Sequence, residues 1–192
     1  MKHTLRNQAQ RAGIALAAVA AFSALGTGTS QAASFASAAV TLDRFGNLEC
    51  TLRETGLPPG GTVRYDCTAT DVGALTQCFL RNKAVGNSKL MVFHDVSASE
   101  VHNYEVKSNG SIRTAIVTQV PESEANALLC TAPAELKVSA VRWCNASIVD
   151  LTNNIVGASE PVLFVQLIAN APGSVPSCAT LATLPGLPPG EE

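Results

Sequence analysis

The chain has 192 residues, of which 46% are apolar and 15% are charged, and its formal net charge is −2. Lys2, Arg6 and Arg11 precede every acidic residue, so the chain beyond the N-terminal segment is more acidic still. This balance argues against a protein that binds nucleic acid by neutralising phosphates. A single Trp, three His and no cluster of metal-ligand residues argue against most metalloenzymes and haem proteins, and no cofactor is expected.

The first 32 residues have the pattern of an export signal. A basic start is followed by an apolar run over residues 12–25 and by Ser30-Gln31-Ala32, which fits the small-x-small rule for cleavage. The apolar run of about 14 residues is shorter than the ~20 that a membrane-spanning helix needs. We therefore expect residues 1–32 to be removed. The remainder, about one domain in length, would be secreted into the medium without a membrane anchor.

After the signal, short apolar-rich runs alternate with turn residues, and no helical period is sustained. In the run from Thr62 to Cys67, apolar and polar side chains alternate, as in a strand with one buried face. The pattern predicts an all-β protein. In chain order, strands are expected over residues 38–43, 48–54, 62–69, 75–80, 90–95, 101–107, 111–118, 136–143, 146–151 and 161–167.

The dipeptide Asn109-Gly110 is the strongest hairpin signal in the chain. A type I′ turn needs two positive φ angles, which Asn and Gly adopt at low cost. A hairpin here would bring Val106 close to Ile112 and Tyr104 close to Thr114.

This number of short strands favours an immunoglobulin-like sandwich of two antiparallel sheets with disulfides. We expect the sandwich over residues 33–170. Residues 171–192 are rich in Pro and Gly, which predicts an extended tail whose first half Cys178 ties to the sandwich.

All six cysteines follow the signal: Cys50, Cys67, Cys78, Cys130, Cys144 and Cys178. An even number without a Cys-x-x-Cys pair, in an exported chain, predicts disulfides. Cys50 and Cys67 are symmetric about the turn residues 57–61, and symmetric residues of a hairpin face each other, which favours a Cys50–Cys67 bridge. Alternatively, these two thiols face other partners in another sheet.

Several motifs resemble a group of small secreted actinobacterial β-sandwich proteins of unassigned function. They are Glu54-Thr55-Gly56-Leu57, Cys78, Asn109-Gly110-Ser111-Ile112, Cys130 and Asp150-Leu151-Thr152-Asn153, within residues 48–155. The resemblance implies a Cys78–Cys130 bridge, which would leave Cys144–Cys178. The chain lacks the Gly-Gly after Cys78 and the Pro-Pro-Gly after Cys130 of that group, and the group implies no activity.

A second similarity is to the neocarzinostatin-type apoproteins, which are secreted acidic sandwiches that carry a small molecule. It is carried by the run from Val63 to Cys67, by Cys78, and by Cys130 with Cys144. This similarity implies the bridges Cys67–Cys78 and Cys130–Cys144. The two resemblances therefore imply different disulfides.

The imidazoles beyond the signal are His94 and His102, and no Gly-x-Ser-x-Gly motif presents a nucleophile. His94 and Asp95 are consecutive on an expected strand, so their side chains point to opposite faces and do not form a catalytic pair. His94, Asp95, Glu100 and His102 could converge on a metal ion, but a polar loop is the favoured interpretation. No catalytic or metal-binding residue is assigned.

The aromatic side chains fall within expected strands, where burial is their expected role. They are Tyr65, Phe79, Phe93, Trp143 and Phe164. The chain therefore does not show the exposed aromatic faces that sugar-binding modules present.

The sequence thus favours a secreted, non-enzymatic module that binds an unknown extracellular ligand or protein. The alternative is a carrier of a small apolar metabolite. A third hypothesis is a protease inhibitor acting through residues 121–126 or 84–89. A binding site would lie where loops cluster at one end of a sandwich, with residues 70–75, 82–89 and 119–134 as candidates.

Overall fold

The computed structural model describes residues 32–97, 102–121 and 130–187, all of which belong to one unit, Gln31–Glu192. The predicted export signal lies outside the described residues except for Ala32. The elements are β1 (Ser34–Leu42), β2 (Leu48–Thr55), β3 (Thr62–Leu80), β4 (Lys83–Val96), β5 (His102–Glu105), β6 (Ile112–Thr118), β7 (Glu135–Asp150), β8 (Ile155–Gln166) and α1 (Cys178–Leu181).

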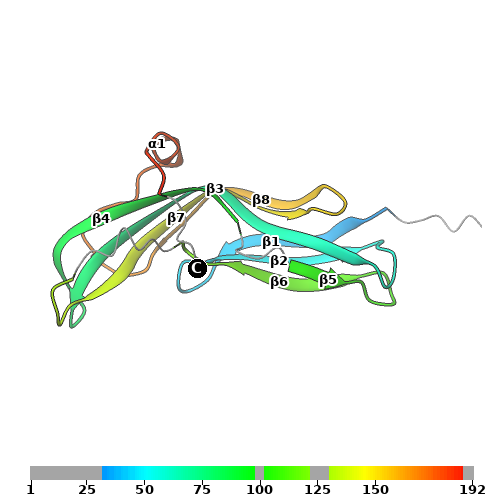
Figure 1. Ribbon diagram of the computed structural model, residues 1–192, viewed down its shortest axis with the longest axis horizontal. Helices are drawn as coiled ribbons and strands as arrows, with labels where there is room; N and C mark the ends of the chain where they lie inside the picture. Colours follow the sequence, from blue (N-terminus) through cyan, green and yellow to red (C-terminus); the bar gives the residue numbers. More distant parts are fainter. Residues whose placement is uncertain (1–31, 98–101, 122–129, 188–192) are drawn as a thin grey trace, which may run out of the picture. The chain divides into compact units, whose positions relative to one another are not determined.

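The strands form two antiparallel sheets, which confirms the all-β two-sheet fold (Figure 1). The three-stranded sheet has the order β1-β2-β6. The five-stranded sheet has the order β4-β3-β7-β8, and β5 pairs with the first part of β3.

The core lies between the two sheets and follows from alternation along each strand. In β2, Leu48, Cys50 and Leu52 are buried, whereas Thr51 and Arg53, on the opposite face of the strand, are exposed. The inward side chains of the five-stranded sheet meet this row, with Trp143 fully buried among them. The Trp143 indole N–H donates to the Gly46 carbonyl at 2.8 Å, so its one polar atom is satisfied.

Two pairs of predicted strands are each one continuous strand in the structure. Residues 62–69 and 75–80, expected as separate strands, are both part of β3, and the expected strands 136–143 and 146–151 both fall in β7, which ends at Asp150. The interruption expected at residues 70–75 is wrong because β3 continues through it, and residues 71–75 are buried on both faces of the sheet. A strand buried on both sides loses the alternation on which sequence-based boundaries depend.

The Asn109-Gly110 turn is present, but the predicted hairpin is wrong. The Gly110 N–H donates to the Lys107 carbonyl at 2.9 Å, and Gly110 has a φ of 68°, whereas Asn109 does not have a positive φ. The turn is therefore not type I′. The strands on either side also enter different sheets, because β5 pairs with β3 and β6 pairs with β2. Tyr104 accordingly lies opposite Val63 rather than beside Thr114.

A turn of the type I′ kind occurs instead between β3 and β4. Arg81 and Asn82 have φ angles of 48° and 66°, and Leu80 pairs with Lys83 across them. Residues 83–89, expected within a loop, belong to β4 and pair with β3 around an irregularity in register. The sequence did not predict this turn, because its central residues are Arg81 and Asn82 and not the Asn-Gly pair typical of a type I′ turn.

Cys178 ties the C-terminal segment to β7, as predicted, but the described part of this segment, residues 171–187, packs on the sheet and is not an extended tail. Val175 and Leu181 are buried in a second apolar cluster with Leu75, Val92 and Ala140 on the outer face of the five-stranded sheet. Figure 1 shows α1 on the side of this sheet formed by β4, β3 and β7. The Leu187 N–H donates to the Val92 carbonyl at 2.7 Å, so the segment is fastened to β4 as well. We call residues 171–187 the C-terminal strap.

Three disulfides close the fold: Cys50–Cys67, Cys78–Cys130 and Cys144–Cys178. Cys78–Cys130 is the bridge implied by the first resemblance and Cys144–Cys178 is the pair that it left, whereas the pairing implied by the neocarzinostatin-type similarity is wrong. The Cys50–Cys67 bridge was predicted from a hairpin, and that reason is wrong. Cys50 lies on β2 and Cys67 on β3, in different sheets, so the bridge crosses the core.

Candidate functional site

Two of the three candidate loops meet at one end of the five-stranded sheet. The β3–β4 turn at residues 81–82 lies beside the segment that leads into β7, because Phe79 pairs with Glu135. The Cys78–Cys130 bridge ties the same two segments together. Residues 70–75 do not contribute, since they lie within β3. Residues 122–129 of the third candidate lie outside the described residues.

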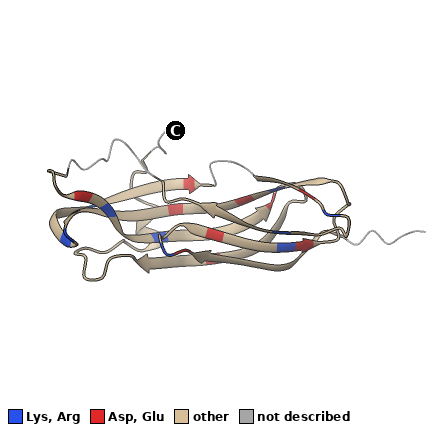
Figure 2. Cartoon of the chain, turned by 90° about the horizontal axis from the view of Figure 1, so that it is seen from below, with Lys and Arg blue, Asp and Glu red and all other residues tan. Residues whose placement is uncertain are grey.

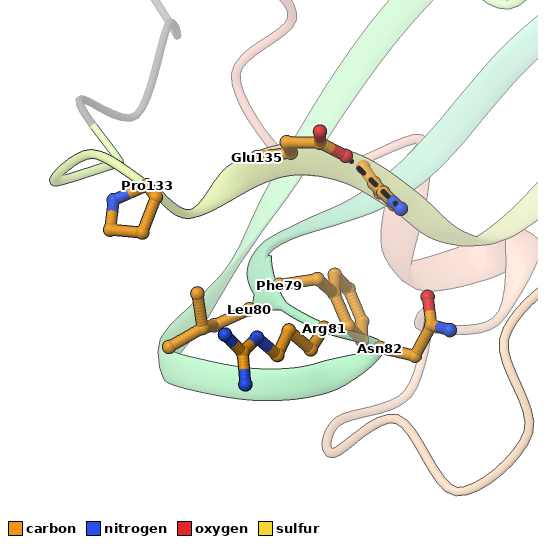
Figure 3. Close-up of a pocket in the computed structure, with 7 residues that line it drawn as sticks. Phe79, Leu80, Arg81, Asn82, Pro133 and Glu135 are labelled. Atoms are coloured by element: carbon orange, nitrogen blue, oxygen red, sulfur yellow. Dashed lines mark ion pairs between the residues drawn. The ribbon is translucent and has the colours of Figure 1, made fainter.

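We call this region the hairpin end, and it contains an open hollow of about 370 Å³. Figure 3 shows that its walls come from the β3–β4 turn on one side and the start of β7 on the other. The lining residues are Phe79, Leu80, Arg81, Asn82, Pro133, Glu135 and Lys137. The lining of the hollow therefore combines apolar side chains with charged and amide side chains.

The charges at the hairpin end are mostly positive. Glu135 and Lys137 form an ion pair at 3.3 Å, and its exposure makes it weak. Arg81 and Lys83 are exposed and have no ion-pair partner in the described ranges. Elsewhere, acidic and basic residues are interspersed along the strands (Figure 2). The hairpin end is thus a cationic site on an acidic chain.

Exposed leucines flank these cations. Leu80 is 38% exposed and Leu136 is 41% exposed, and Leu136 lies opposite Cys78 in the sheet register. An apolar side chain beside an unpaired cation can contact a partner that carries both an apolar group and a carboxylate.

His94 contacts Asp71 rather than its neighbour Asp95. The His94 Nδ1 lies 2.5 Å from Asp71 Oδ1, and Nε2 lies 3.0 Å from the Leu184 carbonyl oxygen in the C-terminal strap. The hydrogen bond to Asp71, and then that to Leu184, raises the pKa of His94 above 6.5. In a catalytic triad, Nε2 would face a nucleophile. Here it faces a backbone carbonyl, so the arrangement fastens the strap.

The metal site considered from the sequence involved His94, Asp95, Glu100 and His102. Glu100 lies outside the described residues. Across the part of the chain that the structure describes, no group of three or more His, Cys, Asp or Glu is arranged to bind a metal ion.

Sequence reasoning missed a buried acidic pair. Glu54 at the end of β2 and Asp150 at the end of β7 are both fully buried, although they come from different sheets. The Tyr65 hydroxyl donates to Glu54 Oε2 at 2.6 Å. The sequence did single out both residues, because Glu54 begins one motif of the first resemblance and Asp150 begins another. What the sequence did not show is that the two motifs meet.

Burial of the aromatic side chains is confirmed for four of the five. Tyr65, Phe79, Phe93 and Trp143 are at most 3% exposed. The predicted burial of Phe164 is wrong. This side chain is 46% exposed on the outer face of β8, where the Arg142 guanidinium lies over its ring at 5.0 Å.

A second hollow, of about 640 Å³, lies on the outer face of the three-stranded sheet. It is lined by Ser37, Thr51, Leu52, Arg53, Arg113, Thr114 and Ala115. Most of these side chains are polar or charged, so the lining does not suit an apolar metabolite.

Comparisons with protein-family models, with curated proteins and with solved structures find no match to this chain. Among the described residues, no helix combines the length and apolar character needed to cross a membrane. A functional assignment therefore depends on the geometry of the chain itself.

Proposed function

We propose that this protein is a secreted, non-enzymatic binding module of immunoglobulin-like type that binds an acidic extracellular protein segment at the hairpin end. The observation that carries the proposal is the hollow between residues 79–82 and 133–137, with Arg81 at its rim. Cations without an ion-pair partner in the described residues, flanked by exposed leucines, are complementary to carboxylates beside apolar groups.

Two further observations support parts of this proposal. Three disulfides are typical of a protein that folds in an oxidising compartment, which supports secretion. The sheet orders β1-β2-β6 and β4-β3-β7-β8 divide the strands between two packed sheets as in immunoglobulin-like sandwiches.

The hairpin end is also suited to binding because it is held in place. The Cys78–Cys130 bridge fixes the two walls of the hollow, and β3 continues from this turn into the buried sheet. A site whose backbone is already ordered loses less conformational entropy on binding than a mobile loop.

The experiment is an NMR titration of residues 33–192 with a soluble poly-glutamate peptide, and with poly-lysine as the charge control. We expect shifts concentrated at residues 79–83 and 133–137, weakened by salt. The double variant R81A/K83A should lose these shifts. The matched control R53A, an exposed arginine on β2, should keep them.

Shifts spread over both sheets, or unchanged in R81A/K83A, would overturn the hairpin end as the binding site. Native mass spectrometry of the protein from its own culture medium tests the carrier alternative. An additional small-molecule mass that is lost on denaturation would replace the present proposal with a carrier function.

A further inference from the structure

The three buried polar groups Glu54, Tyr65 and Asp150 occupy the interface between the two sheets. Glu54 comes from β2 in the three-stranded sheet, whereas Tyr65 on β3 and Asp150 on β7 belong to the five-stranded sheet. All three side chains are fully buried, and their residues are registered together, since Tyr65 pairs with Asp150. The group therefore links the sheets at the β2 end through polar contacts rather than apolar packing.

Hydrogen bonds distinguish the two carboxyl groups. Asp150 accepts from the Thr152 N–H at 2.7 Å, the Asn153 N–H at 3.0 Å and the Asn153 side-chain amide at 2.6 Å. Glu54 accepts from the Tyr65 hydroxyl through Oε2, and its buried Oε1 has no hydrogen-bond donor. Asp150 is thus arranged as an anion, and Glu54 is the member of the pair that can hold a proton.

Apart from Asp150, the neighbours of Glu54 among the described residues are aromatic or apolar side chains and supply no counterion. From β1, Phe35 pairs with Glu54 and packs its ring against Tyr65. From β6, Ile112 lies opposite Glu54. From β5, Tyr104 packs against Tyr65 and His102 packs against Tyr104. No Lys or Arg of the described residues forms an ion pair with Glu54 or Asp150.

Two ionised carboxylates in such an environment repel each other at low dielectric constant, so a proton between them is favoured. Burial is the main cause that raises the pKa of Glu54, to about 7, and the charge of Asp150 raises it further. The hydrogen bond from Tyr65 acts in the opposite direction, because it stabilises the carboxylate.

We propose that Glu54 is a proton-operated latch between the two sheets. With its proton, the Glu54 carboxyl donates to the Asp150 carboxylate and holds the end of β2 against β3 and β7. Without its proton, two like charges face each other across the interface, and the sheets separate at this end. The device operates near neutral pH and is independent of ligand binding at the hairpin end.

The latch also gives a physical role to the sequence motifs that begin with Glu54 and with Asp150. Asp150 organises the turn after β7 through its bonds to Thr152 and Asn153, and the Leu151 N–H donates to the Arg64 carbonyl on β3 at 2.8 Å. After Glu54, Gly56 has a φ of 77° and the Leu57 N–H donates to the Gly110 carbonyl at 3.1 Å. Both carboxyl groups are therefore held by ordered turns, which fixes their separation.

The first test compares the melting temperatures of the wild type and E54Q from pH 4 to pH 9. A raised folded pKa means that Glu54 contributes its full stability below about pH 4.5, and that this contribution is lost as the pH rises through about 7. Gln keeps the acceptor for Tyr65 and can donate to Asp150 at every pH. As the pH rises from 4.5 to 8, the melting temperature of E54Q minus that of the wild type should therefore increase by roughly 5–10 °C. E105Q, at an exposed acid on β5, should show no such gain.

Two further variants should move the pH at which Glu54 loses its proton in opposite directions. D150N removes the neighbouring charge and should lower the midpoint, whereas Y65F removes the bond that stabilises the carboxylate and should raise it. A purely structural role of these residues would change the melting temperature without ordered shifts of the midpoint.

Direct titration of the wild type keeps the proposal falsifiable if a variant does not fold. In protein labelled with ¹³C at the Glu side-chain carboxyl, Glu54 should titrate near pH 7, accompanied by faster amide exchange at the end of β2. A Glu54 midpoint near 4.5, or a midpoint near 7 without loosening of β2, would overturn the latch.

Discussion

His94 and Asp71 form the polar contact that fastens the C-terminal strap to the outer face of the five-stranded sheet. Asp71 on β3 holds Nδ1 of the imidazole, which places Nε2 against the Leu184 carbonyl. Gly186 lies directly on the ring, since a Cβ there would overlap His94 Cδ2. Both ring nitrogens face oxygen acceptors, so the protonated imidazole satisfies both contacts and the neutral ring only one.

The first prediction concerns Asp71→Asn. Loss of the carboxylate should lower the pKa of His94 toward 6.5, because the bond to Asp71 is the main cause of its rise. A raised folded pKa stabilises the fold fully below pH 6.5, and this stabilisation is lost as the pH rises through the folded pKa. The wild type should therefore exceed D71N in stability most at acidic pH. NMR titration of the His94 ring checks this, and an unchanged midpoint in D71N would contradict it.

The second prediction concerns Gly73, where β3 passes under the strap. A Cβ at this position would lie 2.7 Å from Val175 Cγ1 and 2.8 Å from Leu181 Cδ2. Gly73→Ala should lower the free energy of unfolding by about 1–3 kcal/mol through overpacking, and Gly73→Val should displace the strap. Limited proteolysis within residues 171–187 measures the displacement. Gly60→Ala, where a Cβ meets nothing within 4 Å, is the steric control. Its φ of 74° adds local strain, but it leaves the strap in place.

The third prediction concerns the bridge between the sheets. The double variant C50A/C67A should lose about 3 kcal/mol of stability from chain entropy, because the bridge closes a separation of 17 residues. Both sulfurs are also buried in the core, so truncation leaves a space that adds to this loss. Denaturant unfolding gives the value. A loss below 1 kcal/mol would mean that apolar packing alone holds the sheets together.

The fourth prediction separates stability from binding at the hairpin end. Arg81 and Asn82 adopt positive φ angles, which are costly for side chains other than Gly and Asn. The double variant R81N/N82G should raise the free energy of unfolding by about 1 kcal/mol and should also weaken poly-glutamate binding. N82A should lower stability by a similar amount. Thermal unfolding and the NMR titration measure the two effects on the same samples.

Much of the fold was predictable because the relevant signals are local. Alternation from Val63 to Cys67 placed a strand with one buried face, and the structure buries Val63, Tyr65 and Cys67. The hairpin at Asn109-Gly110 was not predictable, since a turn signal does not specify whether the next strand stays in the same sheet. The predicted burial of Phe164 was wrong for a related reason, because the exposure of this side chain depends on whether another segment covers the outer face of β8.

For the candidate site, too, the sequence predicted some features and the tertiary structure decided the others. Sequence reasoning chose residues 82–89 and 119–134, and the structure joins parts of both through Phe79, Glu135 and the Cys78–Cys130 bridge. It also chose residues 70–75, which lie within a continuous strand where the strap covers Gly73 and Leu75. That stretch contains Asp71 and Gly73, whose residue types are common in turns. Their positions are explained instead by the packing of Gly73 under α1 and the contact of Asp71 with His94.

The sequence by itself determined that this protein is built from strands and that its cysteines are suited to disulfides, because alternation and composition are properties of neighbouring residues. Only the tertiary structure decided which residues meet across sheets. Glu54 and Asp150 are separated by most of the domain in the chain, yet both are buried in one interface. Their interaction follows from burial and from the mutual repulsion of two carboxylates, which depend on the distance in space and not along the chain.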